Sequence, residues 1–95
     1  DELTPQTVEQ LTAVATCISE QGRQVILEAH ADDRGTEEYN ILLTERRGLQ
    51  VRQLLSDSGV PLELLKVLAK GSLEATGRDE AGRAQDRRVS IIWPQ

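Results

Sequence analysis

Residues 24–47 read QVILEAHADDRGTEEYNILLTERR, and this stretch decides the fold. It opens with a short apolar run rich in β-branched side chains, which predicts a buried strand over residues 24–29. Residues 30–38 are polar and contain Gly35, so they predict a loop. The apolar spacing that follows predicts a helix over residues 39–56. The stretch therefore reads as a strand, a loop and a long helix.

The rest of the chain adds elements on both sides of this unit. Helical spacing of apolar residues, glycines at helix ends and short apolar runs indicate these helices and strands. The expected elements are a helix over residues 5–20, a short helix over 61–64, a strand over 65–70, a small helix within 79–85 and a strand over 88–93. Strands separated by helices imply an α/β (α+β) two-layer sandwich, with the helices on one face of a small sheet.

Composition limits the size of the domain and its partners. A chain of 95 residues has room for a single domain, residues 1–95, with a small core. Its 16 acidic and 11 basic residues give a net charge of −5, which disfavours binding to a nucleic-acid backbone. Tyr39 and Trp93 are too few rings for a base-stacking surface. Cys17 stands alone, so no internal disulfide is expected, and no apolar run approaches a membrane span.

Charged side chains gather where the first strand passes into the long helix. Ligands of α/β folds usually bind at the carboxyl ends of strands, where Asp32 lies. Arg47 shares a helix side with Leu43 and Val51, so it can point back toward the loop. A carboxylate and a guanidinium that face one cavity suit a zwitterion, with Asp32 on its ammonium and Arg47 on its carboxylate. From spacing alone, a purely structural role for the two residues is favoured.

The same segment resembles the C-terminal domain of the OmpA family. The family's Gly-His-Thr-Asp-x-x-Gly, Tyr-Asn and Leu-Ser-x-x-Arg-Ala motifs correspond here to AHADDRG (29–35), YN (39–40) and LTERRG (43–48). The run DRGTEEYN (33–40) is most similar to the peptidoglycan-associated (Pal) branch of the family. The segment GRAQDRRV (82–89) resembles the family's closing Gly-Arg-Ala-x-Asn-Arg-Arg-Val. The resemblance therefore covers nearly the whole chain.

This resemblance implies non-catalytic binding of peptidoglycan through the diaminopimelate of its stem peptide, which anchors the outer membrane or an envelope complex to the cell wall. In the family, the positions that match Asp32 and Arg47 are the central ligand contacts. Thr36, Asn40 and Leu43 match positions that line the same pocket. The implied location is the periplasm of a Gram-negative bacterium, in association with the outer membrane. No metal and no cofactor are expected.

The chain departs from the family pattern at several positions. Ala29 and Gly48 replace a glycine and an alanine, and Ser72 and Asp86 replace a glutamate and an asparagine. Gly48 inside a helix is expected to cost about 1 kcal/mol. Asp86 is expected to add negative charge beside Arg87. The family also has a strand before the first helix, so the sheet is expected to lack that strand unless something outside this chain completes it.

A metal site and an enzyme are two alternative interpretations of the polar loop. The metal site would draw on His30, Asp32, Asp33, Glu37 and Glu38. These residues lack the alternating oxygen ligands of a calcium loop. The enzyme would use Asp32 and Glu37 for acid/base hydrolysis of a glycan. No apolar pocket that would raise a carboxyl pKa is evident, and no Ser-His or Cys-His nucleophile signature is present.

A protein-interaction module is the third alternative. Such a module would join a periplasmic complex like that of the Tol system, with weak or lost wall binding. The helix face with Leu49, Arg52 and Gln53, or the loop over residues 72–86, could serve as its surface. The arginine pair at residues 87–88 is expected to be a salt-bridged strand start rather than an anion-binding patch.

Overall fold

The computed structural model describes residues 5–94. They form α1 (Pro5–Gln21), β1 (Val25–His30), α2 (Glu37–Asp57), the 3₁₀ helix η1 (Leu62–Leu64), β2 (Leu65–Gly71), α3 (Glu80–Asp86) and β3 (Arg88–Ile92). Each expected element is confirmed in kind, and its ends lie within two residues of the expected ones. One boundary matters for chemistry, because His30 was expected to begin the loop and instead ends β1.

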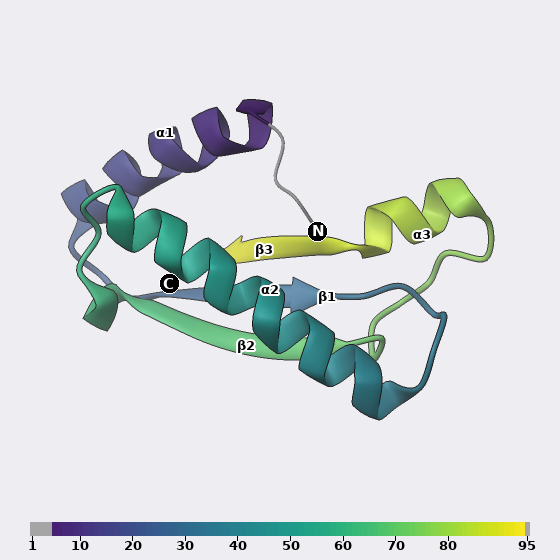
Figure 1. Ribbon diagram of the computed structural model, residues 1–95. Coiled ribbons are helices and arrows are strands. Elements are labelled where there is room, and N and C mark those ends of the chain that lie inside the picture. Colours follow the sequence, from purple (N-terminus) through teal and green to yellow (C-terminus); the bar gives the residue numbers. More distant parts are fainter. Residues whose placement is uncertain (1–4, 95) are drawn as a thin grey trace.

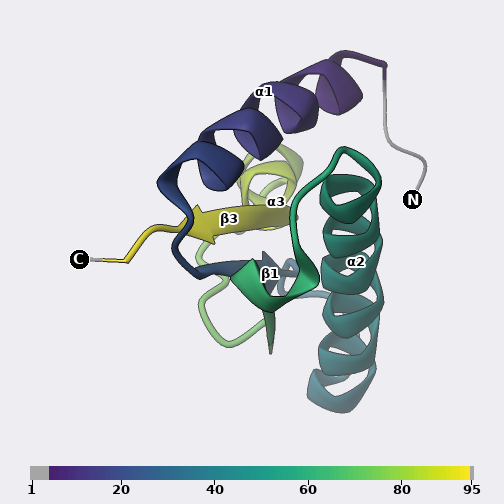
Figure 2. The ribbon, with the colours of Figure 1, turned by 90° about the vertical axis from the view of Figure 1, so that its left-hand side faces the viewer.

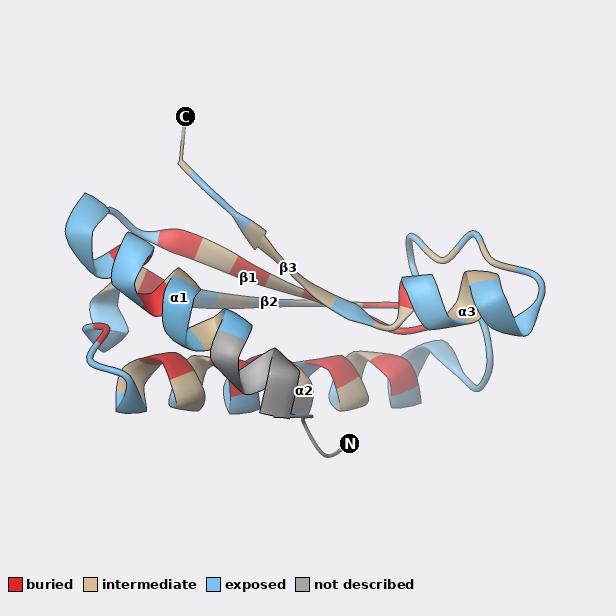
Figure 3. Ribbon diagram, turned by 90° about the horizontal axis from the view of Figure 1, so that it is seen from above, coloured by how far each residue is buried: buried red, intermediate tan, exposed pale blue. Residues whose placement is uncertain are grey.

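The strands form one mixed sheet in the order β2-β1-β3. β1 lies at the centre, parallel to β2 and antiparallel to β3. Both α1 and α2 cover the same face of the sheet, and the opposite face carries no helix among residues 5–94 (Figure 3). Figure 2 shows α2 as a layer separate from the strands. The two-layer sandwich is therefore confirmed, while the expected absence of the family's strand before α1 concerns a part of the chain outside the described residues.

The core lies between β1 and the two long helices. On β1, Val25, Leu27 and Ala29 are fully buried, and they alternate with the partly exposed Ile26 and Glu28. Alternate residues of a strand point to opposite faces, so the buried set faces the helices. The main apolar cluster comprises Ala15, Ile18, Val25, Leu27, Val51, Leu55, Val60 and Leu65. No helix in the described part of the chain is long and apolar enough to span a membrane.

The sheet-facing side of α2 is more polar than its apolar pattern predicted. Its buried residues are Asn40, Thr44, Gly48, Val51 and Leu55. The Thr44 hydroxyl accepts the backbone N–H of Gly71 at 3.1 Å, so it ties α2 to the end of β2. A Cβ at Gly48 would lie 2.5 Å from Val67 Cγ1. Glycine lowers the stability of the helix at this position, as expected from the sequence. It also has a packing role, because the absence of a side chain lets α2 approach β2 closely.

The segment from β2 to β3 folds back on itself beyond the end of the sheet, where α3 lies (Figure 1). Asp86, at the end of α3, is 4% exposed. Its carboxylate accepts the backbone N–H groups of Thr76, at 3.2 Å, and Gly77, at 2.9 Å. The sequence predicted only that Asp86 adds negative charge beside Arg87, and the fold adds this structural contact. The carboxylate holds the turn by accepting two partly buried backbone N–H groups.

Candidate functional site

Asp32 lies two residues after β1, and its side chain is only 8% exposed. The Oδ2 atom accepts a hydrogen bond from Arg34 Nη2 and another from Arg87 Nη1, each at 2.7 Å. The Oδ1 atom accepts the backbone N–H of Arg34 at 3.0 Å. This carboxylate is therefore neutralised by two guanidinium groups, whereas the sequence suggested a carboxylate that faces an open cavity.

The two arginines extend this contact into a network that joins the β1–α2 loop to α3. Arg87 also donates from Nη2 to Glu80 at 2.7 Å. Arg83 of α3 donates to Asp33 at 2.8 Å. Arg87 belongs to the pair at 87–88, so the expected salt-bridged strand start is confirmed there. The network fixes the loop although its members are up to 55 residues apart in sequence.

These contacts lower the pKa values of three carboxyl groups. The Arg34 hydrogen bond, helped by Arg87, holds the pKa of Asp32 well below its usual range, although burial opposes this shift. Hydrogen bonding from Arg83 lowers the pKa of Asp33, and hydrogen bonding from Arg87 lowers that of Glu80. All three groups are consequently ionised at neutral pH, and none is suited to act as a general acid.

Thr36 and Asn40 hold the loop at the start of α2. The Thr36 hydroxyl caps the helix by accepting the backbone N–H of Tyr39 at 3.1 Å. Asn40 is 3% exposed, and its side-chain amide donates to the backbone carbonyl of Arg34 at 2.9 Å. The structure therefore brings Asp32, Thr36 and Asn40 together in one loop, in which each also has a structural contact.

Leu43 and Arg47 are half-buried on α2. Helical geometry places both on one flank of the line of buried residues that faces the sheet. It lies opposite the flank with Leu49 and Arg52, which line a groove together with residues of β2. Since α2 rises about 1.5 Å per residue, Arg47 lies about 10 Å along the helix from Asn40. The joint action of Asp32 and Arg47 on one ligand stays a prediction.

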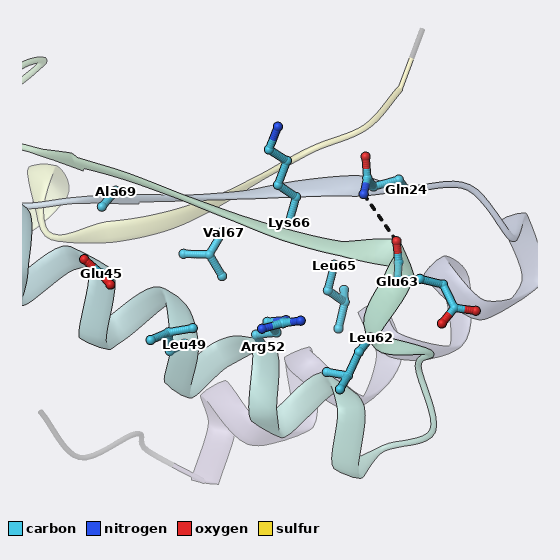
Figure 4. Close-up of a pocket in the computed structure, with 10 residues that line it drawn as sticks. All are labelled: Gln24, Glu45, Leu49, Arg52, Leu62, Glu63, Leu65, Lys66, Val67 and Ala69. Carbon is cyan, nitrogen blue, oxygen red and sulfur yellow. Dashed lines mark hydrogen bonds between the residues drawn. The ribbon is translucent and has the colours of Figure 1, made fainter.

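A groove of about 600 Å³ lies on the opposite flank of α2, along the free edge of β2 (Figure 4). None of the five predicted ligand residues lines it. Leu49 and Arg52, which the protein-interaction alternative named, do line it, and Gln53 does not. The full lining is Gln24, Glu45, Leu49, Arg52, Leu62, Glu63, Leu65, Lys66, Val67 and Ala69. This groove and the Asp32 loop are therefore separate features.

The metal alternative for the polar loop is not supported by the contacts. The carboxylates of Asp32 and Asp33 form ion pairs with arginines. His30 instead meets Glu28 and Glu74, from β1 and from the turn after β2. His30 is a hydrogen-bonded residue at the end of β1, with its Nε2 2.8 Å from Glu28 Oε1.

Two residues of the Asp32 site were missed from the sequence. Arg34 follows Asp32 by two residues, the spacing at which an aspartate side chain accepts a backbone N–H in an Asx turn. That local signal was available. Arg87 is 55 residues from Asp32, and no local pattern connects them. Only the folding of β3 beside β1 brings Arg87 to the loop.

Comparison with known proteins supports the fold and identifies the family. Residues 1–89 match the OmpA family. The peptidoglycan-associated lipoprotein of Pseudomonas aeruginosa is 39% identical over 92 residues, which are 95% of this chain and 55% of that protein. The chain therefore spans about half the length of the curated relatives it matches.

Solved structures lead to the same family. The peptidoglycan-associated lipoprotein from Burkholderia pseudomallei superposes with a TM-score of 0.88 at 32% identity, over 96% of this chain and 80% of that one. The C-terminal domain of Helicobacter pylori MotB gives a TM-score of 0.84 at 20% identity, over 96% of this chain and 74% of that one, which shows the fold alone. The chain belongs to the OmpA family, and as a member of that family it is a binding domain rather than an enzyme.

Proposed function

We propose that this chain is a non-catalytic peptidoglycan-binding domain of a Gram-negative cell envelope, and that it holds the diaminopimelate of the stem peptide. Its place would be the periplasm, where it would link the outer membrane or an envelope complex to the wall. Support comes from the family match and from relatives that are named as peptidoglycan-associated. Asp32 and Arg47 would be the central contacts, with Thr36, Asn40 and Leu43 around them.

The observation that carries this proposal is the buried, ionised Asp32 at the carboxyl end of the central strand. The side-chain end of diaminopimelate carries an ammonium and a carboxylate. Arg34, whose side chain is 54% exposed, is the partner of Asp32 that a ligand ammonium can replace. Exchanging one cation for another keeps the buried carboxylate paired, which avoids a large desolvation cost. Arg47 would then receive the ligand carboxylate bidentately.

Two neighbouring arginines of α2 provide a matched test. Arg47→Ala should weaken binding of a diaminopimelate stem peptide about ten- to a hundredfold, the range expected for losing a charged hydrogen-bonded contact. Arg46→Ala removes an exposed arginine from the adjacent position and should change binding less than twofold. Calorimetric titration measures both variants, and co-sedimentation with sacculi extends the result to the polymer.

The ligand itself can be varied in the same titration. A stem peptide with lysine in place of diaminopimelate keeps the ammonium and lacks the carboxylate. Wild-type protein should bind it at least tenfold more weakly, and Arg47→Ala should erase that preference. Equal affinities for the two peptides, or equal losses in the Arg46 and Arg47 variants, would show that the site is assigned wrongly.

The protein-interaction module stays the second candidate. The groove favours it, because Leu49 and Arg52 line a hollow beside the edge of β2 that no other strand of residues 5–94 covers. A partner of the periplasmic Tol kind would then bind on the flank of α2 opposite Arg47. The substitution Leu49→Asp should abolish such binding and leave the stem-peptide affinity unchanged.

A further inference from the structure

A second cluster of chemistry-bearing side chains lies on the face of the sheet that carries no helix. Glu28 and His30 are two residues apart on β1, so both point to that face. Glu74 comes from the turn after β2 and meets them there. Each of the three offers one ligand atom, and these atoms all lie within 4.8 Å of one another. We propose that Glu28, His30 and Glu74 form a binding site for a divalent transition-metal ion of the Zn²⁺ kind.

The imidazole of His30 is already oriented toward one of the two carboxylates. The residue is 2% exposed, and its Nε2 lies 2.8 Å from Glu28 Oε1. Nε2 is therefore the nitrogen that faces the cluster, and a metal ion bound there would replace the hydrogen bond between these two atoms and take both as ligands. The Nδ1 atom lies on the other side of the ring, where it is buried and has no hydrogen-bond partner in the described part of the chain.

The cluster contains two carboxylates, and a lysine already pairs with one of them. Lys70 places its ammonium 3.2 Å from the Glu74 carboxylate, and this flexible, exchangeable partner occupies the carboxylate that a metal would take. Arg88 pairs with His30 across the sheet, but its guanidinium donates to Ser90 at 3.1 Å. A metal ion therefore has to displace the Lys70 ammonium. The net charge of −5 for the whole chain adds a general attraction for cations.

The donor set identifies the class of metal. One imidazole nitrogen with carboxylate oxygens suits Zn²⁺ and its neighbours, which accept both ligand types. Calcium and magnesium prefer oxygen ligands alone, so the histidine disfavours them. The ligands come from β1 and from the turn after β2, and His30 lies two residues before Asp32. A bound ion would therefore fasten that turn to the central strand beside the predicted peptidoglycan loop. The site does not depend on the proposed function.

The test is a zinc titration of the full chain by calorimetry, with cobalt(II) absorption as a second readout of coordination. All variants carry Cys17→Ser, because the exposed Cys17 thiol would itself bind zinc. One ion per chain is expected. Glu74→Gln should weaken binding at least tenfold, whereas Glu63→Gln, an exposed glutamate away from the cluster, should leave the affinity unchanged.

A third variant separates a metal site from a purely structural cluster. Lys70→Gln removes the cation that competes for Glu74, so the zinc affinity should rise severalfold. Loss of a merely structural contact would not raise it. The proposal is overturned if the Cys17→Ser protein binds no zinc stoichiometrically, or if the Glu74 and Lys70 variants bind zinc as the Glu63 control does. Since Glu74 is half-exposed, its substitution should leave the fold intact.

Discussion

At the scale of single residues, Asp32 has two roles, one predicted from the sequence and one seen only in the fold. Asp32 was expected to be a ligand contact, and it also anchors Arg34 and Arg87. Removing its side chain would take away the carboxylate that the two guanidinium groups share. Asp32→Asn is therefore the better test of ligand binding than Asp32→Ala, because it keeps the shape and one acceptor oxygen.

Gly48 offers a residue-scale prediction about packing. Alanine is a better helix former than glycine by about 1 kcal/mol. The added Cβ would, however, lie 2.5 Å from Val67 Cγ1, and overpacking of this kind costs about 1–3 kcal/mol. Gly48→Ala should therefore lower the free energy of unfolding by about 1 kcal/mol, measured by urea denaturation.

The control for this prediction is a double-mutant cycle with Val67→Ala. In that background the opposing methyl group is gone, so Gly48→Ala should raise the free energy of unfolding through its helix propensity. If Gly48→Ala changes the free energy of unfolding equally in the wild type and in Val67→Ala, then the close approach of α2 to β2 is not the reason that alanine is unfavourable at this position. The sequence shows that a glycine lies within a helix. Only the packing of β2 against that helix explains why a larger residue does not fit there.

At the scale of elements, the segment from β2 to β3 depends on contacts that its sequence did not reveal. It was expected to be largely irregular with one small helix, and α3 confirms the helix. Its attachment to the rest of the chain is tertiary. Arg83 reaches Asp33, and Arg87 reaches Asp32 and Glu80. Surface ion pairs contribute little singly, so the linked network matters more than any one of them.

Asp86 provides the element-scale prediction. Asp86→Ala removes the acceptor for the backbone N–H groups of Thr76 and Gly77. The loss of two partly buried hydrogen bonds, each contributing about 0.5–1.5 kcal/mol, should cost about 1–3 kcal/mol of stability. Hydrogen exchange at the Thr76 and Gly77 amides should accelerate. Asp86→Asn is the matched control, because its side-chain oxygen can still accept and should largely preserve protection. Equal exchange rates in the alanine variant and the wild type would contradict this role.

At the scale of the whole molecule, the lowered carboxyl pKa values predict how stability depends on pH. The pKa of Asp32 is lowered in the fold by Arg34 and Arg87, while an unfolded aspartate has a pKa of about 4. The stabilisation is therefore complete above about pH 4 and is lost as the pH falls toward the folded value. Asp33 and Glu80 act in the same direction. The free energy of unfolding should be lower at pH 3 than at pH 6.

Two variants isolate the contribution of Asp32 to this pH dependence. Asp32→Asn removes the titrating group, and Arg34→Gln removes the largest cause of its shift. Both should reduce the difference in unfolding free energy between pH 6 and pH 3, measured by urea denaturation. An undiminished difference in both variants would place the acid sensitivity elsewhere.

The order and type of the elements, the two-layer architecture and the position of the polar loop followed from sequence alone. They depend on local properties, namely apolar spacing, glycine stops and the family motif around residues 29–48. Tertiary structure alone decided which partners the charged side chains take. Arg87 meets Asp32, Asp86 meets Thr76 and Gly77, and Glu74 meets His30. These contacts join residues that are 9 to 55 positions apart. Such a contact leaves no periodic signal in the sequence, because it needs only that the fold brings an acceptor and a donor or cation within reach.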